Sequence, residues 1–396
     1  MDQVPETHAH RRAIVRSGLA SRGLSALLVT DLVNVRYLTG FTGSNGALYL
    51  AADGAPEGGA AAGSESAVPA VPAVLAVLAT DGRYTAQAAQ QVPDLRVIIE
   101  RDCAFALLSD ATGAGADGPG GPVARVGFEA GDMTVSAHAG LLERLGQGQS
   151  APELVPTTGI VEDVRAVKDD TEIELIARAC AIGDAALADL IGEGALAPGR
   201  TERQVARRLE WLMFEHGAEA VAFETIVAAG ANSAIPHHRP TDDVLATGDL
   251  VKLDFGATVA GYNSDMTRTV VLGAADDFQR GTYALVLAAQ EAGVAAVRAG
   301  VSAADVDRAA RAVIEDAGVG ELFSHGRGHG GGLRVHEAPG VSSAATGTLP
   351  AGAVVTVEPG VYHVGHGGVR IEDTLVVRDG GSEILTKTGK DLRVLN

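Results

Sequence analysis

Five side chains in the second half of the chain have the chemistry of metal ligands: Asp254, Asp265, His329, Glu358 and Glu372. Asp254 stands within the apolar run 250–255, and Asp265 begins the run 265–271. A carboxylate in such a setting must be paired, hydrogen-bonded or bound to a cation, because burying it alone is costly. Gly261 lies between the two acids and suits a tight turn, so they could face each other across a β-hairpin.

An ordinary structural role is the competing interpretation for either aspartate taken alone. Asp265 could cap a turn, and Asp254 could pair with Lys252 or Arg268. Only the joint pattern of all five residues favours a metal site over this alternative.

His329 lies in a glycine-rich segment, 325–332, that reads HGRGHGGG. Glycines this dense let backbone and ligand approach closely, and they are a poor choice for a core strand. A phosphate-binding loop would need a Gly-Lys-Ser/Thr sequence, which this segment lacks. The local histidines therefore favour a metal.

The two glutamates also stand at strand ends. Glu358 follows the apolar run 354–357, and Glu372 precedes the run 374–377. Singly, each could be a solvated strand end. Four carboxylates and one imidazole together favour hard divalent ions, so Mn²⁺ is the expected metal, with Co²⁺, Fe²⁺ and Zn²⁺ as alternatives. Bridging carboxylates would hold two such ions about 3.5–4 Å apart, whereas a structural zinc site would more often use cysteine.

Elements that could position these residues follow from hydrophobic periodicity. The first part of the chain predicts an opening helix over 10–19 and strands at 25–30, 47–51, 73–79 and 96–99. Two segments, 53–70 and 111–122, are rich in Gly, Ala, Ser and Pro. They bury too little apolar surface to order themselves, so we interpret them as surface insertions, the first between two strands.

The second part predicts two successive units of two helices followed by strands. Thr171-x-x-Glu174 and Thr201-x-x-Gln204 are capping boxes that open the first two helices, the second ending at Gly217. The remaining predicted helices cover 281–300 and 302–318, and the predicted strands are 225–229, 250–255, 267–272, 354–357 and 374–377. This order favours an α+β fold with an internal duplication.

Composition excludes several classes of protein. A chain of 396 residues favours two domains. A formal charge of −19 argues against a nucleic-acid partner. Two cysteines rule out a disulfide framework. The polar N-terminus and the proline-interrupted apolar stretch 67–79 fit neither a signal peptide nor a membrane span, so a cytoplasmic location is expected.

Five segments, taken in order, resemble the metallopeptidase family with the pita-bread fold, which includes methionine aminopeptidase, aminopeptidase P and prolidase. They are 253–257 (LDFGA), 262–270 (YNSDMTRTV), 328–339 (GHGGGLRVHEAP), 356–362 (TVEPGVY) and 368–374 (GVRIEDT). Two further segments, 37–45 (YLTGFTGSN) and 81–84 (DGRY), resemble the N-terminal domain of the Xaa-Pro branch.

The resemblance implies a fold and a domain organisation. A creatinase-like α/β N-terminal domain is expected at 1–160, carrying both insertions, and a pita-bread catalytic domain with pseudo-two-fold duplication at 165–396. Creatinase and histone-chaperone-like relatives share the fold but have lost metal ligands, whereas this sequence keeps all five. By family analogy the protein is also expected to be a homodimer.

The resemblance further implies a role for each site residue. Asp254 would chelate one metal, Asp265 and Glu372 would bridge both, and His329 and Glu358 would complete the two coordination shells. A hydroxide between the metals would be the nucleophile, and Glu358 would accept the proton.

Four residues beyond the metals are implied in substrate binding. His237 and His336 match family histidines that bind substrate and stabilise the tetrahedral intermediate, and His325 matches another histidine of the substrate pocket. Arg370 would bind a substrate carboxylate or order the bridging glutamate.

The expected function is therefore hydrolysis of the bond before proline in dipeptides or short peptides by a dinuclear-metal exopeptidase. The tertiary proline nitrogen offers no N–H to ordinary peptidase sites. The choice between a dipeptidase and an aminopeptidase stays open. The alternatives are a creatinase-like C–N hydrolase of a small molecule and a non-catalytic peptide-binding relative.

Overall fold

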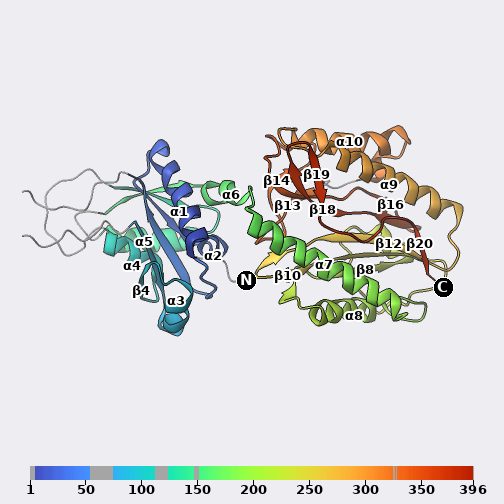
Figure 1. Ribbon diagram of the computed structural model, residues 1–396, viewed down its shortest axis with the longest axis horizontal. Helices are drawn as coiled ribbons and strands as arrows, with labels where there is room; N and C mark the ends of the chain where they lie inside the picture. Colours follow the sequence, from blue (N-terminus) through green and yellow to red (C-terminus); the bar gives the residue numbers. More distant parts are fainter. Residues whose placement is uncertain are drawn as a thin grey trace, which may run out of the picture. The chain divides into compact units, whose positions relative to one another are not determined.

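The computed structural model of the chain describes residues 5–53, 75–111, 124–146, 151–323, 326 and 328–395. These divide into two compact units, 1–164 and 165–396 (Figure 1). Most of both predicted insertions, and His325, lie outside the described residues. Within the described ranges, no helix combines the length and apolarity needed to cross a membrane.

The first unit is built on a mixed six-stranded sheet in the order β4-β3-β2-β1-β5-β6. Its strands are β1 (Ala26–Val29), β2 (Gly46–Ala51), β3 (Ala76–Thr80), β4 (Arg96–Ile99), β5 (Arg125–Glu129) and β6 (Glu153–Thr157). Its helices are α1 (Pro5–Leu19), α2 (Leu32–Thr39), α3 (Thr85–Gln91), α4 (Cys103–Ala111), α5 (Val135–Leu145) and α6 (Ile160–Arg165), with short 3₁₀ turns η1 (Ala20–Arg22) and η2 (Gly82–Tyr84).

The four strands predicted for this unit are confirmed as β1 to β4, and the first predicted insertion is flanked by β2 and β3. The sequence did not predict β5 or β6. The β5 sequence RVGFE has charged ends and a glycine, and the β6 sequence ELVPT contains a proline. Neither segment shows the apolar run that marks a strand.

The second unit repeats one order of elements twice, which confirms the predicted α+β pattern. The helices are α7 (Asp170–Gly192), α8 (Glu202–Glu215), α9 (Asp277–Ala296) and α10 (Ala303–Asp316), with 3₁₀ turns η3 (Gly230–Ala234) and η4 (Gly320–Leu322). Six strands follow the first helix pair: β7 (Ala220–Val221), β8 (Ile226–Ala229), β9 (Leu250–Phe255), β10 (Ala257–Val259), β11 (Tyr262–Asn263) and β12 (Met266–Leu272). Eight follow the second: β13 (Gly328–Gly330), β14 (Glu337–Val341), β15 (Val354–Val357), β16 (Gly360–His363), β17 (Gly367–Arg370), β18 (Asp373–Arg378), β19 (Gly381–Ile384) and β20 (Arg393–Leu395).

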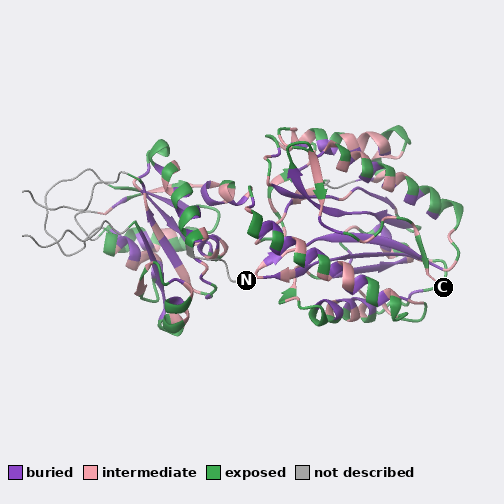
Figure 2. Cartoon of the chain, viewed as in Figure 1, coloured by how far each residue is buried: buried purple, intermediate pink, exposed green. Residues whose placement is uncertain are grey.

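The helices of this unit lie outside its strands, with α8 and α10 on opposite sides of them (Figure 1). Their apolar faces pack inward, so the central strands β8, β9, β12 and β15 are buried while the outer helix faces are exposed (Figure 2). The buried strands belong mainly to two sheets, one ordered β20-β12-β9-β8 and the other β14-β13-β15-β18-β19.

One predicted capping box is wrong by two residues. Helix α7 is capped by Asp169, whose carboxylate accepts the backbone N–H of Glu172 at 2.9 Å, while Glu172 accepts the N–H of Asp169 at 3.1 Å. Thr171 and Glu174 instead lie within the first turns of the helix. Aspartate caps as well as threonine does, so the two overlapping patterns cannot be separated by residue type.

The second capping box, Thr201 with Gln204, is confirmed at the start of α8. The predicted stop is also confirmed, because the helix ends at Glu215 and Gly217 follows in the left-handed region, with φ 96°. Glycine adopts this conformation without steric cost. The third and fourth predicted helices correspond to α9 and α10.

The expected hairpin between Asp254 and Asp265 is present. Strands β9 and β12 are antiparallel, and β10 and β11 between them close on a two-residue turn at Ala260 and Gly261. Both turn residues have positive φ, 47° and 78°, as the tightest hairpin turns require.

Gly256, at the base of this hairpin, has no room for a side chain. A Cβ there would lie 1.9 Å from the carbonyl oxygen of Ser264, the residue before Asp265. Gly256→Ala should therefore lower the free energy of unfolding by about 1–3 kcal/mol, as overpacking does. Gly281→Ala, in an open position on α9, is the matched control and should be neutral or slightly stabilising. Thermal unfolding measures both, and equal stabilities of the two variants would contradict the constraint.

Candidate metal centre

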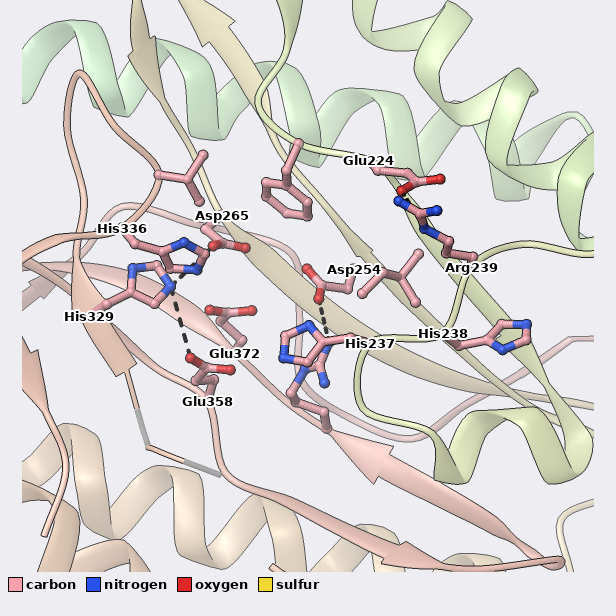
Figure 3. Close-up of a pocket in the computed structure, with 14 residues that line it drawn as sticks. Glu224, His237, His238, Arg239, Asp254, Asp265, His329, His336, Glu358 and Glu372 are labelled. Carbon is pink, nitrogen blue, oxygen red and sulfur yellow. Dashed lines mark hydrogen bonds and ion pairs between the residues drawn. The ribbon is translucent and has the colours of Figure 1, made fainter. Parts of the chain in front are cut away.

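A cavity of about 260 Å³ in the second unit collects the predicted site residues (Figure 3). Its wall includes all five predicted metal ligands: Asp254, Asp265, His329, Glu358 and Glu372. It also includes three of the four predicted substrate-binding residues: His237, His336 and Arg370. The fourth, His325, lies outside the described residues.

The two aspartates come from the first of the two sheets. Asp254 is the fifth residue of β9, directly opposite Thr267 of β12, and Asp265 is the residue before β12 begins. The close turn of the hairpin thus holds both carboxylates at the end of one strand pair.

The two glutamates come from the second sheet. Strands β15 and β18 are antiparallel, with Val357 opposite Asp373. Glu358 follows Val357 and Glu372 precedes Asp373, so the two glutamates are neighbours at the end of this strand pair. The backbone N–H of Glu372 also donates to the carbonyl of Thr267 at 3.1 Å, which joins the second strand pair to the first.

His329 reaches the same space from β13. Its backbone N–H donates to Thr356 Oγ1 at 3.2 Å, and its ring Nδ1 lies 3.1 Å from the carbonyl oxygen of Gly330. With the proton on Nδ1, the lone pair of Nε2 is free to bind a metal. That Nε2 atom lies 3.4 Å from Asp265 Oδ2 and 3.9 Å from Glu358 Oε1.

Three of the potential ligands, Asp265, His329 and Glu372, have ligand atoms that all lie within 4.8 Å of one another. Figure 3 shows Glu358 beside this group and Asp254 on the far side of Glu372. The five predicted ligands therefore face a single space.

Two buried carboxylate oxygens in this space, Asp254 Oδ1 and Glu372 Oε1, have no hydrogen-bond partner among the described residues. The adjacent Asp373 shows the contrast, since it is equally buried and its two oxygens accept four hydrogen bonds. Its donors are Arg268, Gln290, Thr386 and Lys390. A buried acceptor left without a donor needs an explanation, and a cation supplies one. The residues of this site therefore fit bound divalent metal ions.

The charges of the site point the same way. Burial and the nearby carboxylates raise the pKa of Asp265 and of Glu358 well above their usual range. Burial, and then the charge of Asp254, raises the pKa of Glu372 to about 7. Like charges held this closely resist ionisation unless cations lie between them.

Arg370 is fully buried and its guanidinium is engaged by the protein. It forms an ion pair with Asp254 Oδ2, and it donates to Thr267 Oγ1, the carbonyl of Pro236 and the hydroxyl of Tyr362, each at 3.0 Å. Thr267 Oγ1 in turn donates to Glu372 Oε2 at 2.7 Å. Arg370 thus contacts one metal-ligand candidate directly and a second one through Thr267.

The two cations named as partners of Asp254 in the structural alternative are both engaged elsewhere. Lys252 donates to the carbonyls of Ile235 and Pro236, and Arg268 pairs with Asp373. Neither cation forms an ion pair with Asp254 among the described contacts, and its buried partner is Arg370.

The predicted substrate-binding histidines flank the metal-ligand candidates. The ring of His336 packs edge-on against His329, with ring centroids 4.3 Å apart. Burial, and then the neighbouring His329 and His237, lowers the pKa of His336. A neutral imidazole can donate one hydrogen bond to a substrate and accept another.

The sequence did not single out the rest of the pocket wall. It includes the apolar side chains of Phe223, Ile226 and Val335, the exposed ion pair of Glu224 with Arg239 at 2.9 Å, and His238. The apolar residues carry no chemical signature. His238 stands beside His237 in the sequence, and this adjacency was the one signal available.

Comparison with known proteins bears on this geometry. Residues 174–379 match Metallopeptidase family M24, and residues 11–57 and 58–167 match the Creatinase/Prolidase N-terminal domain. An Xaa-Pro dipeptidase of Pyrococcus horikoshii is 42% identical over 253 residues, which cover 64% of this chain and 72% of that protein.

Solved structures give the same result over the whole chain. An Xaa-Pro dipeptidase from Bacillus anthracis has a TM-score of 0.86 at 34% identity and covers 98% of this chain and 100% of its own. An X-Pro aminopeptidase from Thermotoga maritima has a TM-score of 0.81 at 32% identity and covers 97% of this chain and 99% of its own. These matches confirm the predicted pita-bread fold with an N-terminal domain, and the chain belongs to metallopeptidase family M24.

Proposed function

We propose that this chain is a dinuclear-metal exopeptidase that hydrolyses the bond before proline in dipeptides or short peptides. The observation that carries the proposal is the convergence of five ligand side chains around two buried carboxylate oxygens that lack donors. Similarity to proteins named Xaa-Pro dipeptidase and X-Pro aminopeptidase supports the proline specificity. The cavity of about 260 Å³ suits a short peptide.

The proposed ligands are the five predicted from the sequence, with Asp265 and Glu372 as bridges and Asp254, His329 and Glu358 completing the two shells. Mn²⁺ is the proposed ion, because four carboxylates and one imidazole form a hard donor set. When bound, the two ions would lower the pKa of a water molecule and polarise the scissile carbonyl. No finding favours the creatinase-like or the non-catalytic alternative.

The side chains around the metals have separate proposed tasks. Glu358, whose carboxylate lies 3.9 Å from His329 Nε2, would accept the proton of the attacking water and pass it to the leaving proline nitrogen. His237 and His336 line the cavity and would donate hydrogen bonds to the substrate carbonyl as its oxygen gains charge. His325 is proposed as a further substrate contact on the family resemblance alone.

Arg370 is proposed as a positioning residue. Its three nitrogen atoms all donate to protein groups, and it holds Asp254 directly and Glu372 through Thr267. These bonds support the ordering of the metal-ligand candidates over the binding of a substrate carboxylate, the two roles implied by the resemblance.

The larger organisation is proposed on the same basis. The N-terminal domain would occupy 1–160 and the catalytic domain 165–396, a homodimer would be the working form, and the location would be the cytoplasm. The division into units 1–164 and 165–396 supports the domain boundary. Two free, buried cysteines, Cys103 and Cys180, fit a reducing compartment.

Metal binding should stabilise the protein, and more so at high pH. Acidic groups with raised pKa values, such as Glu372 at about 7, make the metal-free fold lose stability as pH rises through that value. Mn²⁺ must displace those protons below pH 7 but meets ionised carboxylates above it. At a concentration a hundredfold above its Kd at pH 8, Mn²⁺ should raise Tm by about 5–10 °C at pH 8. The same concentration should raise Tm by less at pH 5.5, where binding is weaker.

Thermal unfolding of chelator-treated protein, with and without Mn²⁺, measures this effect. Glu372→Gln should abolish the increase in Tm. Glu383→Gln, which changes an exposed carboxylate paired with Arg378, should keep it. An increase in Tm of equal size at both pH values, or one that survives Glu372→Gln, would contradict the proposed site.

Substrate preference is tested with Ala-Pro and Ala-Pro-Ala in the metal-loaded enzyme. Release of proline from the first, or of alanine from the second, supports the proposal, and the faster of the two reactions identifies a dipeptidase or an aminopeptidase. Asp265→Ala should reduce kcat/KM by at least about 100-fold, since even partners of metal ligands cost up to that much. Full activity in this variant, or no cleavage of either peptide by the wild type, would overturn the function.

A further inference from the structure

The segment that carries His237 has little regular structure of its own. It follows the 3₁₀ turn η3 and continues through residues 235–243 without forming a helix or a strand. His237 is an exposed side chain on this segment, yet it lines the cavity beside Asp254 (Figure 3). A side chain that must meet a reacting carbonyl needs its backbone held in place, because small displacements cost large factors in rate.

Glu202, the first residue of α8, holds this segment in place through hydrogen bonds. Its side chain is fully buried, and its two oxygens accept five hydrogen bonds. Oε1 accepts from the N–H of Ala229 at 2.8 Å and from Asn232 Nδ2 at 3.0 Å. Oε2 accepts from His238 Nε2 at 2.7 Å and from the N–H and Oγ1 of Thr241 at 2.9 and 2.8 Å. The anchored residues lie on both sides of His237 in the sequence.

The two consecutive histidines point in different directions. His238 is only 9% exposed and lies against Glu202, while His237 turns toward the metal-ligand candidates (Figure 3). Lys252 holds the other side of the segment, donating to the carbonyls of Ile235 and Pro236 at 2.6 and 3.2 Å. Residues 235–238 are thus fixed by contacts on either side of the histidine.

The five contacts require an acceptor without protons. All are made by N–H or O–H groups, so an ionised carboxylate satisfies them and a glutamine would place its own N–H₂ against a donor. The position at the first turn of α8 also favours a negative charge. Glu202 is not part of the cavity wall, and its described contacts include none of the five proposed metal ligands.

We propose that Glu202 is a positioning residue, which sets the place of His237 in the cavity by anchoring the segment 229–241 through His238, Asn232 and Thr241. This inference rests on the proposed function, because the effect on rate passes through the contact of His237 with substrate. It predicts that Glu202 matters only while His237 is present.

A double-mutant cycle on the metal-loaded enzyme, with Ala-Pro or Ala-Pro-Ala as substrate, tests this dependence. Glu202→Gln should lower kcat/KM by about 10–100-fold in the wild-type background, the range seen when a supporting hydrogen bond is lost. In a His237→Ala background the same change should cost less than about twofold, because residues acting as one unit are not additive. Equal losses in both backgrounds, or no effect of either single variant, would overturn the proposal.

A second measurement does not depend on activity. Hydrogen exchange of the backbone amides of 229–241 should become at least about tenfold faster in Glu202→Gln, with the bound metal unchanged per chain. Unchanged exchange in a folded variant contradicts the anchor. If the wild type cleaves no Xaa-Pro peptide, the proposed function fails while exchange still reports on the anchor.

Two further variants separate anchoring from general destabilisation. His238→Phe removes the hydrogen bond from His238 to Glu202 and leaves the other four. It replaces Glu202→Gln if that variant does not fold, with the same expected cycle. Glu193→Gln is the matched control, since it changes an exposed glutamate that pairs with Arg208. A similar loss of activity in this control would overturn the proposal.

Discussion

Four carboxylates crowded into one cavity are the constraint on which the site depends. Asp254, Asp265, Glu358 and Glu372 face a common space, and among the described contacts one buried cation, Arg370, is ion-paired with them. Carboxylates so close cannot all ionise unless positive charge lies between them. Two divalent ions and one hydroxide would neutralise the four carboxylates and Arg370 taken together. The repulsion between the carboxylates, which weakens the metal-free fold, would therefore favour the binding of two metal ions.

The two sheets hold these acids close together. Each supplies its acids from the end of one antiparallel strand pair, β9 with β12 and β15 with β18, and the backbone bond from Glu372 to Thr267 joins the pairs. Asp373, next to Glu372, is neutralised by Arg268 and Lys390. The protein thus separates acids that support the scaffold, which are saturated with donors, from acids that face the cavity, which are not.

Much of the fold and the site could be predicted because the signals are local. The apolar runs at 250–255 and 354–357 correspond to β9 and β15 residue for residue, and the acids inside or beside them line the cavity. Short strands without an apolar run, such as β5 and β6, could not be predicted in this way. The cap of α7 was misplaced because Asp169 and Thr171 both suit that position.

The hydrogen-bond and ion-pair partners of the site residues could not be predicted from the sequence, for a different reason. Glu202 and His238 are 36 positions apart, and Arg370 and Asp254 are 116 apart. Nothing in the sequence around either member of a pair indicates which distant residue it will contact. Such pairings are set by the packing of strands and helices, so sequence patterns identify the ligands but leave out the residues that position them.

The most direct test of the two-metal site is the anomalous scattering of crystals grown from Mn²⁺-loaded protein, recorded on both sides of the manganese absorption edge. Two peaks about 3.5–4 Å apart are expected, with Asp265 and Glu372 contacting both and Asp254, His329 and Glu358 each contacting one. A single peak, or two peaks outside the cavity that holds these five residues, would contradict the dinuclear site.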